Sequence, residues 1–238
     1  MNTQTPLPLE NARQHINVHS VFPTIQGEGP FAGRPAIFVR LFGCNLQCPG
    51  CDTDYTSKRM PYTTDQLLDV CDSHRTAPNP LIVLTGGEPF RQDIRELVLM
   101  LLRNGYAVQV ESNGTVDMDL SSIFEWTLKM DVPEDHFQLV ISPKTAKVAE
   151  SSKRFASAWK YILQAGEVDL DGLPKRSLEM KQRPARPPGA FSNSRVYVQP
   201  MDEKDRDKNQ ANTAAAVASC MKFGFRMSLQ THKILGLE

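Results

Sequence analysis

The sequence predicts an α/β protein: an incomplete, TIM-like barrel of parallel strands whose helices are shortened in the second half. Short, nearly continuous apolar runs rich in β-branched residues recur along the 238 residues, and such runs suit parallel strands that helices cover. Helical segments alternate with these runs in the first half, which favours a parallel sheet or barrel. Residues 117–136 and 164–194 show no full crossover helix, so we expect an open barrel with seven or fewer strands.

Each expected strand is a short apolar run bounded by polar, glycine or proline residues. In chain order the runs are 36–41, 81–84, 107–111, 137–141, 159–163, 196–199 and 227–230. A first helix is expected from Thr63, because Thr63 and Gln66 have the spacing of a capping box. A second helix spans 93–103, where apolar residues recur at helical spacing until Gly105, and an alanine-rich third helix spans 209–223.

The chain is expected to form one domain. Residues 1–17 are polar, contain two prolines and lack an apolar stretch of signal-peptide length, which predicts a flexible N-terminal arm. Residues 18–238 then form the domain, with 164–194 as a loop-rich insertion. Proline, arginine and glycine gather at 181–193 within that insertion and favour an exposed loop.

Composition argues against several classes of protein. Lys+Arg and Asp+Glu number 27 each, and this balance gives no electrostatic reason to expect nucleic acid or an anionic membrane as a partner. No apolar run approaches the roughly 20 residues that a membrane helix needs. The chain is therefore expected in the cytoplasm. There, five cysteines, with three of them in eight residues, indicate a metal or cluster site rather than disulfides.

Cys44, Cys48 and Cys51 directly follow the expected strand 36–41, at the strand end where active-site loops of parallel sheets gather. Thiolates are soft ligands that suit zinc or iron–sulfur clusters. Structural zinc normally takes four protein ligands, whereas three thiolates on a cubane of four irons leave one iron open to a cofactor. The triplet therefore favours an open 4Fe-4S cluster, with a zinc-binding interaction domain as the non-enzyme alternative.

The C-x3-C-x2-C spacing after the first core strand resembles the motif of the radical S-adenosylmethionine (SAM) superfamily. The resemblance implies that superfamily's partial barrel, SAM bound at the open iron, and a 5′-deoxyadenosyl radical that takes hydrogen from a substrate. Thr85-Gly86-Gly87-Glu88-Pro89 ends the next strand and resembles the GGEP motif, which implies that Gly87 contacts SAM. Further SAM-binding residues are implied at Gly50, Cys51, Asp52, Glu111, Ser112, Ser142, Pro143, Lys144 and Gln199.

Within that superfamily the sequence resembles the 7-carboxy-7-deazaguanine synthase family, in the form with the standard cysteine spacing. The similarity runs from residue 18 to the C-terminus and includes Ile25-Gln-Gly-Glu-Gly29, Arg40 and Gln230-Thr-His-Lys233. An arginine fork suits a substrate carboxylate. The resemblance implies that the substrate is bound by Ile25, Gln26, Gly27, Glu28, Arg40 and Thr85. It implies Thr53 as the magnesium ligand. It also implies that the C-terminal residues His232 and Lys233 pack over the site.

The implied reaction converts 6-carboxy-5,6,7,8-tetrahydropterin to 7-carboxy-7-deazaguanine with loss of ammonia, on the path to queuosine and other 7-deazapurines. The implied cofactors are a 4Fe-4S cluster, SAM and Mg²⁺. The implied partners are the small pterin substrate, an electron donor such as flavodoxin, and a second copy in a homodimer. A radical SAM glycyl-radical activating enzyme is the alternative enzyme, since it shares the cysteine spacing but must receive a loop of a partner protein.

Overall fold

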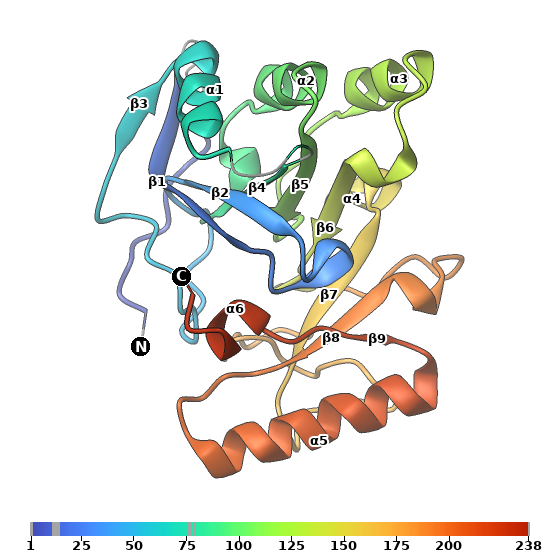
Figure 1. Ribbon diagram of the computed structural model, residues 1–238. Helices are drawn as coiled ribbons and strands as arrows, with labels where there is room; N and C mark the ends of the chain where they lie inside the picture. Colours follow the sequence, from blue (N-terminus) through green and yellow to red (C-terminus); the bar gives the residue numbers. More distant parts are fainter. Residues whose placement is uncertain (1, 11–14, 76–77, 79, 238) are drawn as a thin grey trace.

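Parallel strands form the larger part of one sheet (Figure 1). The computed structural model describes residues 2–10, 15–75, 78 and 80–237. Within these residues the sheet has nine strands in the order β3-β1-β2-β4-β5-β6-β7-β8-β9. Neighbours from β2 to β9 run parallel, whereas β1 is antiparallel to β2 and β3. This open, mostly parallel sheet confirms the α/β class and the incomplete barrel.

The elements follow the chain with short connections. The strands are β1 (Ile16–Ile25), β2 (Pro35–Leu41), β3 (Met60–Tyr62), β4 (Leu81–Gly86), β5 (Ala107–Ser112), β6 (Phe137–Ile141), β7 (Ala158–Leu163), β8 (Val196–Pro200) and β9 (Arg226–Met227). The α-helices are α1 (Thr64–Ser73), α2 (Arg95–Arg103), α3 (Ser121–Lys129), α4 (Glu150–Phe155), α5 (Arg206–Phe223) and α6 (Thr231–Ile234). Among the helices of the described residues, none combines the length and the apolar character that a membrane span requires.

Alternation along the strands separates the core under the helices from the barrel interior. On β2, Val39 and Leu41 are fully buried in the main core, whereas Arg40 lines the interior. Apolar side chains that include Ala36, Leu81 and Ala107 fill the interior near the amino ends of the strands. Figure 1 shows α1, α2 and α3 outside the first strands and α5 along β8 and β9. Polar residues can therefore gather only at the opposite, carboxyl end of the interior.

The C-terminal segment crosses from β9 back to the end of β1. The backbone N–H and the hydroxyl of Thr231 both donate to the Gly27 carbonyl, at 3.4 and 3.1 Å. The Gly29 N–H donates to the Ser228 hydroxyl at 3.1 Å. A Cβ on Gly27 would lie 2.1 Å from Nδ1 of His232, so only glycine at position 27 lets this segment lie so close. The segment thus covers part of the gap that the open sheet leaves.

Several local predictions are confirmed. Thr63 and Gln66 form both bonds of the capping box at the start of α1, at 3.2 and 2.9 Å. Gly105 has a φ of +79° just after α2. Residues 164–194 are all described and contain no α-helix. The alanine-rich helix α5 begins at Arg206 rather than at residue 209, because the side chain of Asp205 caps it.

The sheet has nine strands within the described residues, more than the seven that the apolar runs predict. β1 and β3 are not predicted, because β1 carries His19, Ser20 and Pro23 within it and pairs antiparallel, so it shows no continuous apolar run. β3 has only three residues. The last expected strand, 227–230, is reduced to the short β9. Helix α3 occupies part of 117–136, where only Ile123 of its nine residues is buried and the amphipathic signal is correspondingly weak.

The prediction of a flexible N-terminal arm is wrong for the described part of residues 1–17. β1 already begins at Ile16, and residues 2–10 bond to the cysteine loop and to the turn after β4. The Asn2 N–H donates to the Pro49 carbonyl at 2.9 Å, and the Leu7 N–H donates to the Cys44 carbonyl at 2.7 Å. Polar residues that resemble a solvated tail are instead satisfied by loop carbonyl groups. Residue 1 and residues 11–14 of the expected arm lie outside the described residues.

Candidate active site

A cavity of about 410 Å³ opens at the carboxyl ends of the parallel strands. Five strands each place a polar side chain in its wall; these are Arg40, Thr85, Glu111, Lys160 and Gln199. The cysteine loop after β2, the loops after β4 to β6 and the C-terminal segment complete the lining. Ligand sites of parallel barrels lie at this end of the strands, so this cavity is the candidate active site.

Cys44, Cys48 and Cys51 all line the cavity as unpaired thiols. Burial raises the pKa of each thiol, that of Cys44 to about 12. Thiolates in this position therefore need a cation beside them, which iron supplies. Among the described residues, no three His, Cys, Asp or Glu side chains converge where a single metal ion would sit. In a cubane each thiolate binds its own iron, so three sulfurs around a shared cavity fit a 4Fe-4S cluster.

The other two cysteines lie away from the cavity. Cys71 lies on α1 and is fully buried in the main core, and Cys220 lies on α5. Only three of the described cysteines therefore line the cavity, and three thiolates leave one of the four irons of a cubane without a protein ligand.

The glycine pair after β4 packs against the cysteine loop. A Cβ on Gly87 would lie 2.0 Å from the Gly43 carbonyl oxygen, and a Cβ on Gly86 would lie 2.4 Å from that of Leu41. The Glu88 N–H donates to the Gly43 carbonyl at 3.0 Å. The absence of side chains at Gly86 and Gly87 therefore lets the end of β4 lie directly against the end of β2 and the start of the cysteine loop. Gly87 also borders the cavity, as the SAM assignment requires.

Glu88 is fully buried and joins the loops after β4 and β5. Its carboxylate accepts hydrogen bonds from the Ser112 hydroxyl and the Asn113 N–H, both at 2.7 Å, and from the Phe90 N–H at 3.0 Å. Burial raises the pKa of Glu88 to about 7. The Ser112 hydroxyl also accepts from the Gly114 N–H at 2.9 Å. Ser112 lines the cavity, but its proton is already donated to Glu88, so its position in the loop is its main contribution.

The loop after β6 places a lysine beside the thiols. Lys144 lines the cavity and donates to the Ser142 hydroxyl at 2.8 Å, whereas the buried Pro143 does not line it. Burial, with repulsion from Lys160, lowers the pKa of Lys144 to about 8. On β8, Gln199 is 4% exposed, and its Oε1 has no hydrogen-bond partner among the described residues. This oxygen is an acceptor that a ligand N–H can use.

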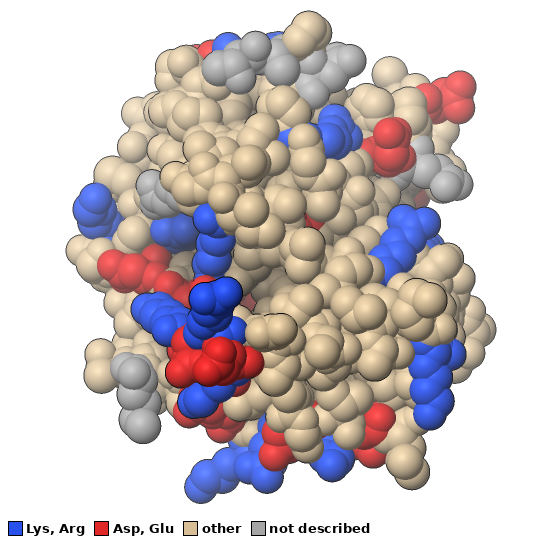
Figure 2. Space-filling model, turned by 60° about the horizontal axis from the view of Figure 1, so that its bottom comes forward, with Lys and Arg blue, Asp and Glu red and all other residues tan. Residues whose placement is uncertain are grey.

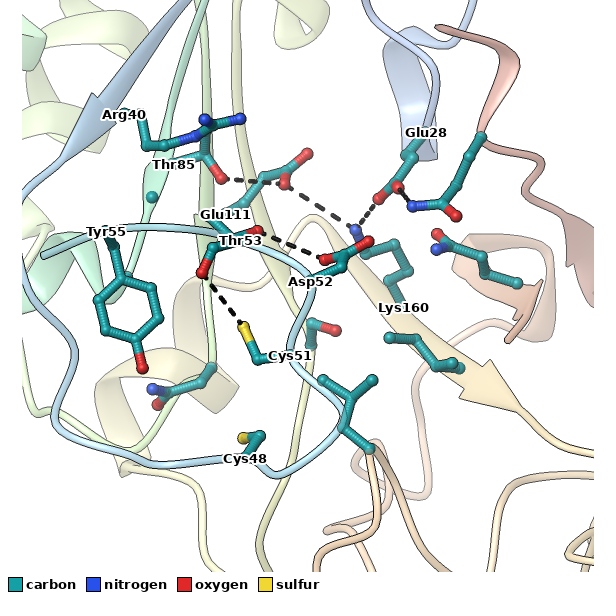
Figure 3. A pocket seen from close by; sticks show the side chains of 18 of the residues that line it. Glu28, Arg40, Cys48, Cys51, Asp52, Thr53, Tyr55, Thr85, Glu111 and Lys160 are labelled. Atoms are coloured by element: carbon teal, nitrogen blue, oxygen red, sulfur yellow. Dashed lines mark hydrogen bonds and ion pairs between the residues drawn. The ribbon is translucent and has the colours of Figure 1, made fainter. Parts of the chain in front are cut away.

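Lys160 on β7 holds two carboxylates deep in the cavity (Figure 3). Its ammonium group bonds to Glu28 and lies 3.9 Å from Glu111. Burial alone would raise the pKa of Glu28, but the charge and hydrogen bond of Lys160 outweigh it and hold that pKa below its usual value. In the same way the two carboxylates raise the pKa of Lys160 against the effect of burial. Glu28 and Lys160 are therefore charged, and together with Glu111 they form a triad at this end of the cavity.

Amide and hydroxyl groups surround the triad of Lys160, Glu28 and Glu111. The amides of Gln26 and Gln109 donate to Glu111 at 3.0 and 2.8 Å, and the Thr85 hydroxyl donates to it at 3.3 Å. The Gln230 amide donates to Glu28 at 3.0 Å. The deep end of the cavity thus presents fixed acceptors and donors, a pattern that suits an amide-rich heterocycle.

Arg40 faces the cavity from β2. Its guanidinium lies 5.2 Å from the centre of the Phe22 ring, and Figure 3 shows it beside Thr85. A planar fork with five donors at this place can bind a carboxylate by two parallel hydrogen bonds.

Thr53 lies where the cysteine loop turns away from the cavity. Its hydroxyl is 3.4 Å from a carboxylate oxygen of Asp52, and both residues line the cavity. A hydroxyl beside a carboxylate offers hard oxygen atoms of the kind that Mg²⁺ prefers, and Mg²⁺ commonly takes few protein ligands while a substrate supplies others. The residues therefore fit a magnesium ion that is completed by a ligand.

Lys233 of the C-terminal segment closes one side of the mouth. Its ammonium group lies 3.0 Å from Asp52 on the cysteine loop and 3.0 Å from Asp202 after β8. His232 lines the cavity, and its Nδ1 is buried against Gly27. Figure 2 shows basic and acidic side chains side by side next to a hollow on the face turned forward. The expected packing of the C-terminal residues over the site is thereby borne out.

Three of the residues expected at the site do not line the cavity: Ile25, Gly27 and Pro143. Gly27 instead seats the C-terminal segment, and Ile25 ends β1 beside it. The cavity also has lining residues that the sequence does not single out: Tyr55, Asn113, Lys160, Leu178 and Asp202. The sequence offers one signal for Lys160: it is the only charged residue in the otherwise apolar expected strand 159–163. Leu178 shows that 164–194 reaches the site, where its carbonyl accepts from the Gly50 N–H at 3.2 Å.

Comparison with known proteins gives a consistent result. Residues 39–131 match the family model described as the radical SAM superfamily. A 7-carboxy-7-deazaguanine synthase of Rhodospirillum rubrum is 40% identical over 228 residues, which cover 92% of this chain and 91% of that protein. A 7-carboxy-7-deazaguanine synthase of Rickettsia prowazekii is 36% identical, with 94% of this chain and 89% of that protein covered.

One solved structure supports the architecture. The crystal structure of QueE from Escherichia coli matches with a TM-score of 0.65 and 22% sequence identity, and the match covers 90% of this chain and 93% of that one. At this identity the likeness bears on the fold, and it agrees with the open, parallel sheet described above.

Proposed function

Because the chain belongs to the 7-carboxy-7-deazaguanine synthase family, we propose that its cavity converts 6-carboxy-5,6,7,8-tetrahydropterin to 7-carboxy-7-deazaguanine, with loss of ammonia. The protein is a radical SAM enzyme of queuosine biosynthesis that uses a 4Fe-4S cluster, SAM and Mg²⁺. The observation that carries the proposal is one cavity lined both by three thiols and by a buried ion pair among polar side chains. The product mass after incubation of reconstituted enzyme with the pterin, SAM, a reductant and Mg²⁺ tests it.

The chain's own residues divide the cavity into two parts. Cys44, Cys48 and Cys51 hold the cluster, which together with SAM supplies the 5′-deoxyadenosyl radical. Residues of the cysteine loop, of the carboxyl ends of β5 and β8 and of the loops after β4 and β6 border the SAM site; those proposed are Gly50, Asp52, Gly87, Glu111, Ser112, Ser142, Lys144 and Gln199, with Glu111 on the border with the pterin end.

The pterin ring is proposed to lie against the triad. Glu28 and Glu111 can accept from the N–H groups of the ring, and Gln26 supplies an amide beside them. Thr85 lies at the same end of the cavity, close to Arg40, which binds the carboxylate. The closeness of Arg40 to Thr85 and the triad supports a ring bound at the triad with its carboxylate toward Arg40.

The activating-enzyme alternative is less well supported. Such an enzyme has to admit a loop of another protein, whereas here the C-terminal segment lies over the mouth and bonds to both sides of it. A cavity of about 410 Å³ is in the range for a small molecule. The zinc alternative would need a closed set of ligands around one ion, and iron analysis distinguishes it directly.

Arg40→Lys is expected to weaken use of the pterin by about tenfold to a hundredfold, the usual worth of one charge-assisted contact. Lysine keeps the charge but cannot form two parallel hydrogen bonds. Steady-state kinetics of both proteins give the ratio, while SAM cleavage without substrate and iron content should stay near normal. Arg34→Lys is the matched control, because Arg34 also lies over an aromatic ring but does not line the cavity. Unchanged kinetics of Arg40→Lys would assign Arg40 a structural role.

Thr53→Ala is expected to raise the Mg²⁺ concentration needed for half-maximal activity, because it removes one hard oxygen ligand. The visible spectrum of the cluster should not change, since the backbone of residue 53 is kept. Thr53→Ser retains the hydroxyl and should restore the normal Mg²⁺ requirement. An enzyme whose turnover is indifferent to chelation of Mg²⁺ contradicts this role.

Several features beyond the reaction rest on the family resemblance. We propose that a flavodoxin supplies electrons, that two copies form a homodimer and that the enzyme works in the cytoplasm. Residues 18–238 are proposed to form one radical SAM domain. Cluster reduction by purified flavodoxin and light scattering of the purified protein test the first two proposals.

A further inference from the structure

Residues 2–10 run along the cysteine loop and bond to the groups that carry the cluster ligands. The Leu7 N–H donates to the carbonyl of Cys44 at 2.7 Å. The Asn2 side-chain amide donates to the carbonyl of Cys48 at 3.2 Å, and the Asn2 N–H donates to the next carbonyl, that of Pro49, at 2.9 Å. The backbones of two of the three cysteines are therefore fixed from outside the loop.

Gln4 fixes the far end of the same loop with both ends of its amide. Its Nε2 donates to the Thr53 carbonyl at 2.8 Å. Its Oε1 accepts from the Tyr55 N–H at 2.8 Å and from the Thr56 hydroxyl at 2.9 Å. Tyr55 is only 2% exposed, so these bonds lie beside a buried ring rather than in open solvent.

A buried arginine joins the segment to the start of the loop. Arg91 is 4% exposed and donates to the carbonyls of Pro8 and Phe42, both at 2.9 Å. Gly43 makes room for it: a Cβ there would lie 2.4 Å from the guanidinium and 2.9 Å from Leu7. The segment is thus anchored at both ends of the loop that it follows.

We propose that residues 2–10 form a clasp that holds the cysteine loop in the shape that retains the 4Fe-4S cluster, with Asn2 and Gln4 as positioning residues. The inference rests on the proposed function, since it requires the cluster. Residues 42–59, all described, contain neither a helix nor a strand, so contacts from outside the loop add to the few hydrogen bonds within it, such as that from the Gly43 N–H to the Tyr55 carbonyl at 2.8 Å. A loop that is ordered before the cluster binds loses less conformational entropy when it binds, and it releases the cluster more slowly.

The lifetime of the cluster in air tests the clasp without any need for turnover. Full-length protein is reconstituted anaerobically, and its visible absorbance and retained iron are followed after exposure to air-saturated buffer. Gln4→Ala is expected to lose its cluster about fivefold faster for each hydrogen bond that stabilised the loop. Gln4→Glu keeps the acceptor for Tyr55 and Thr56 but loses the donor to Thr53, so a smaller acceleration is expected. Thr3→Ala, at an exposed position of the same segment, should behave as the unaltered protein.

The outcomes separate the clasp from the proposed function. A double Asn2→Ala, Gln4→Ala protein with an unchanged cluster lifetime overturns the clasp. If Gln4→Ala also lowers the unfolding temperature of the metal-free protein, Gln4→Glu decides, and an unchanged lifetime in that variant overturns the proposal. Failure of the unaltered chain to take up a four-iron cluster would instead remove the proposed function.

Discussion

Replacement of Cys44, Cys48 or Cys51 by alanine is expected to abolish SAM cleavage. Each thiol lines the cavity, and a cubane with three protein ligands has none to spare. Anaerobic reconstitution of the unaltered chain should give about four irons per chain, and each alanine variant should hold much less. Iron analysis and the formation of 5′-deoxyadenosine measure the two effects separately.

Cys71→Ala and Cys220→Ala are the matched controls for these variants. Both residues are free thiols that lie outside the cavity, so iron content and SAM cleavage should match those of the unaltered protein. Loss of the metal from Cys71→Ala would contradict the open-iron arrangement, because it would identify a fourth ligand.

Lys160→Met is expected to have the second largest effect. Removal of one partner of a buried ion pair typically costs about 3–5 kcal/mol, and here two carboxylates, Glu28 and Glu111, lose their shared cation. A lower unfolding temperature is expected, together with a fall in kcat/KM for the pterin of more than about a hundredfold. Thermal unfolding and steady-state kinetics of the reconstituted enzyme measure the two quantities.

A second variant separates stability from positioning. Lys160→Met combined with Glu28→Gln removes one charge of each sign, so most of the lost stability should return. If Lys160 positions substrate-binding carboxylates, kcat/KM should stay low in the double variant. Recovery of both quantities together would show that Lys160 matters for folding alone.

The sequence predicts those parts of the fold that depend on local apolar pattern. Strands such as 137–141 are nearly continuous apolar runs, and β6 has those bounds in the structure. β1 escapes prediction because its partner is an antiparallel strand, and its residues, including Pro23, follow no single period. Its existence depends on pairing with β2, which a local pattern does not encode.

The same distinction applies to the site. Cys44, Cys48 and Cys51 are predictable because their spacing in the chain is itself the chemical requirement. Lys160 is not predictable in this way, because its role depends on Glu28, which is 132 residues away in the sequence. Its role also depends on burial, which only the folded chain provides. The hydrogen bonds of residues 2–10 are not predictable from the sequence for a related reason. A polar segment looks like a solvated tail until the carbonyl groups to which it donates are known.

The contacts of Lys233 also join parts of the chain that are synthesised at different times. Asp52 and Lys233 are 181 residues apart, and ribosomes add roughly 5–20 residues per second. The cysteine loop is therefore made on the order of ten seconds or more before the residue that bridges it to Asp202. During translation the mouth of the cavity lacks this bridge, so the side that Lys233 closes in the finished chain is open while residues 53–232 are being added.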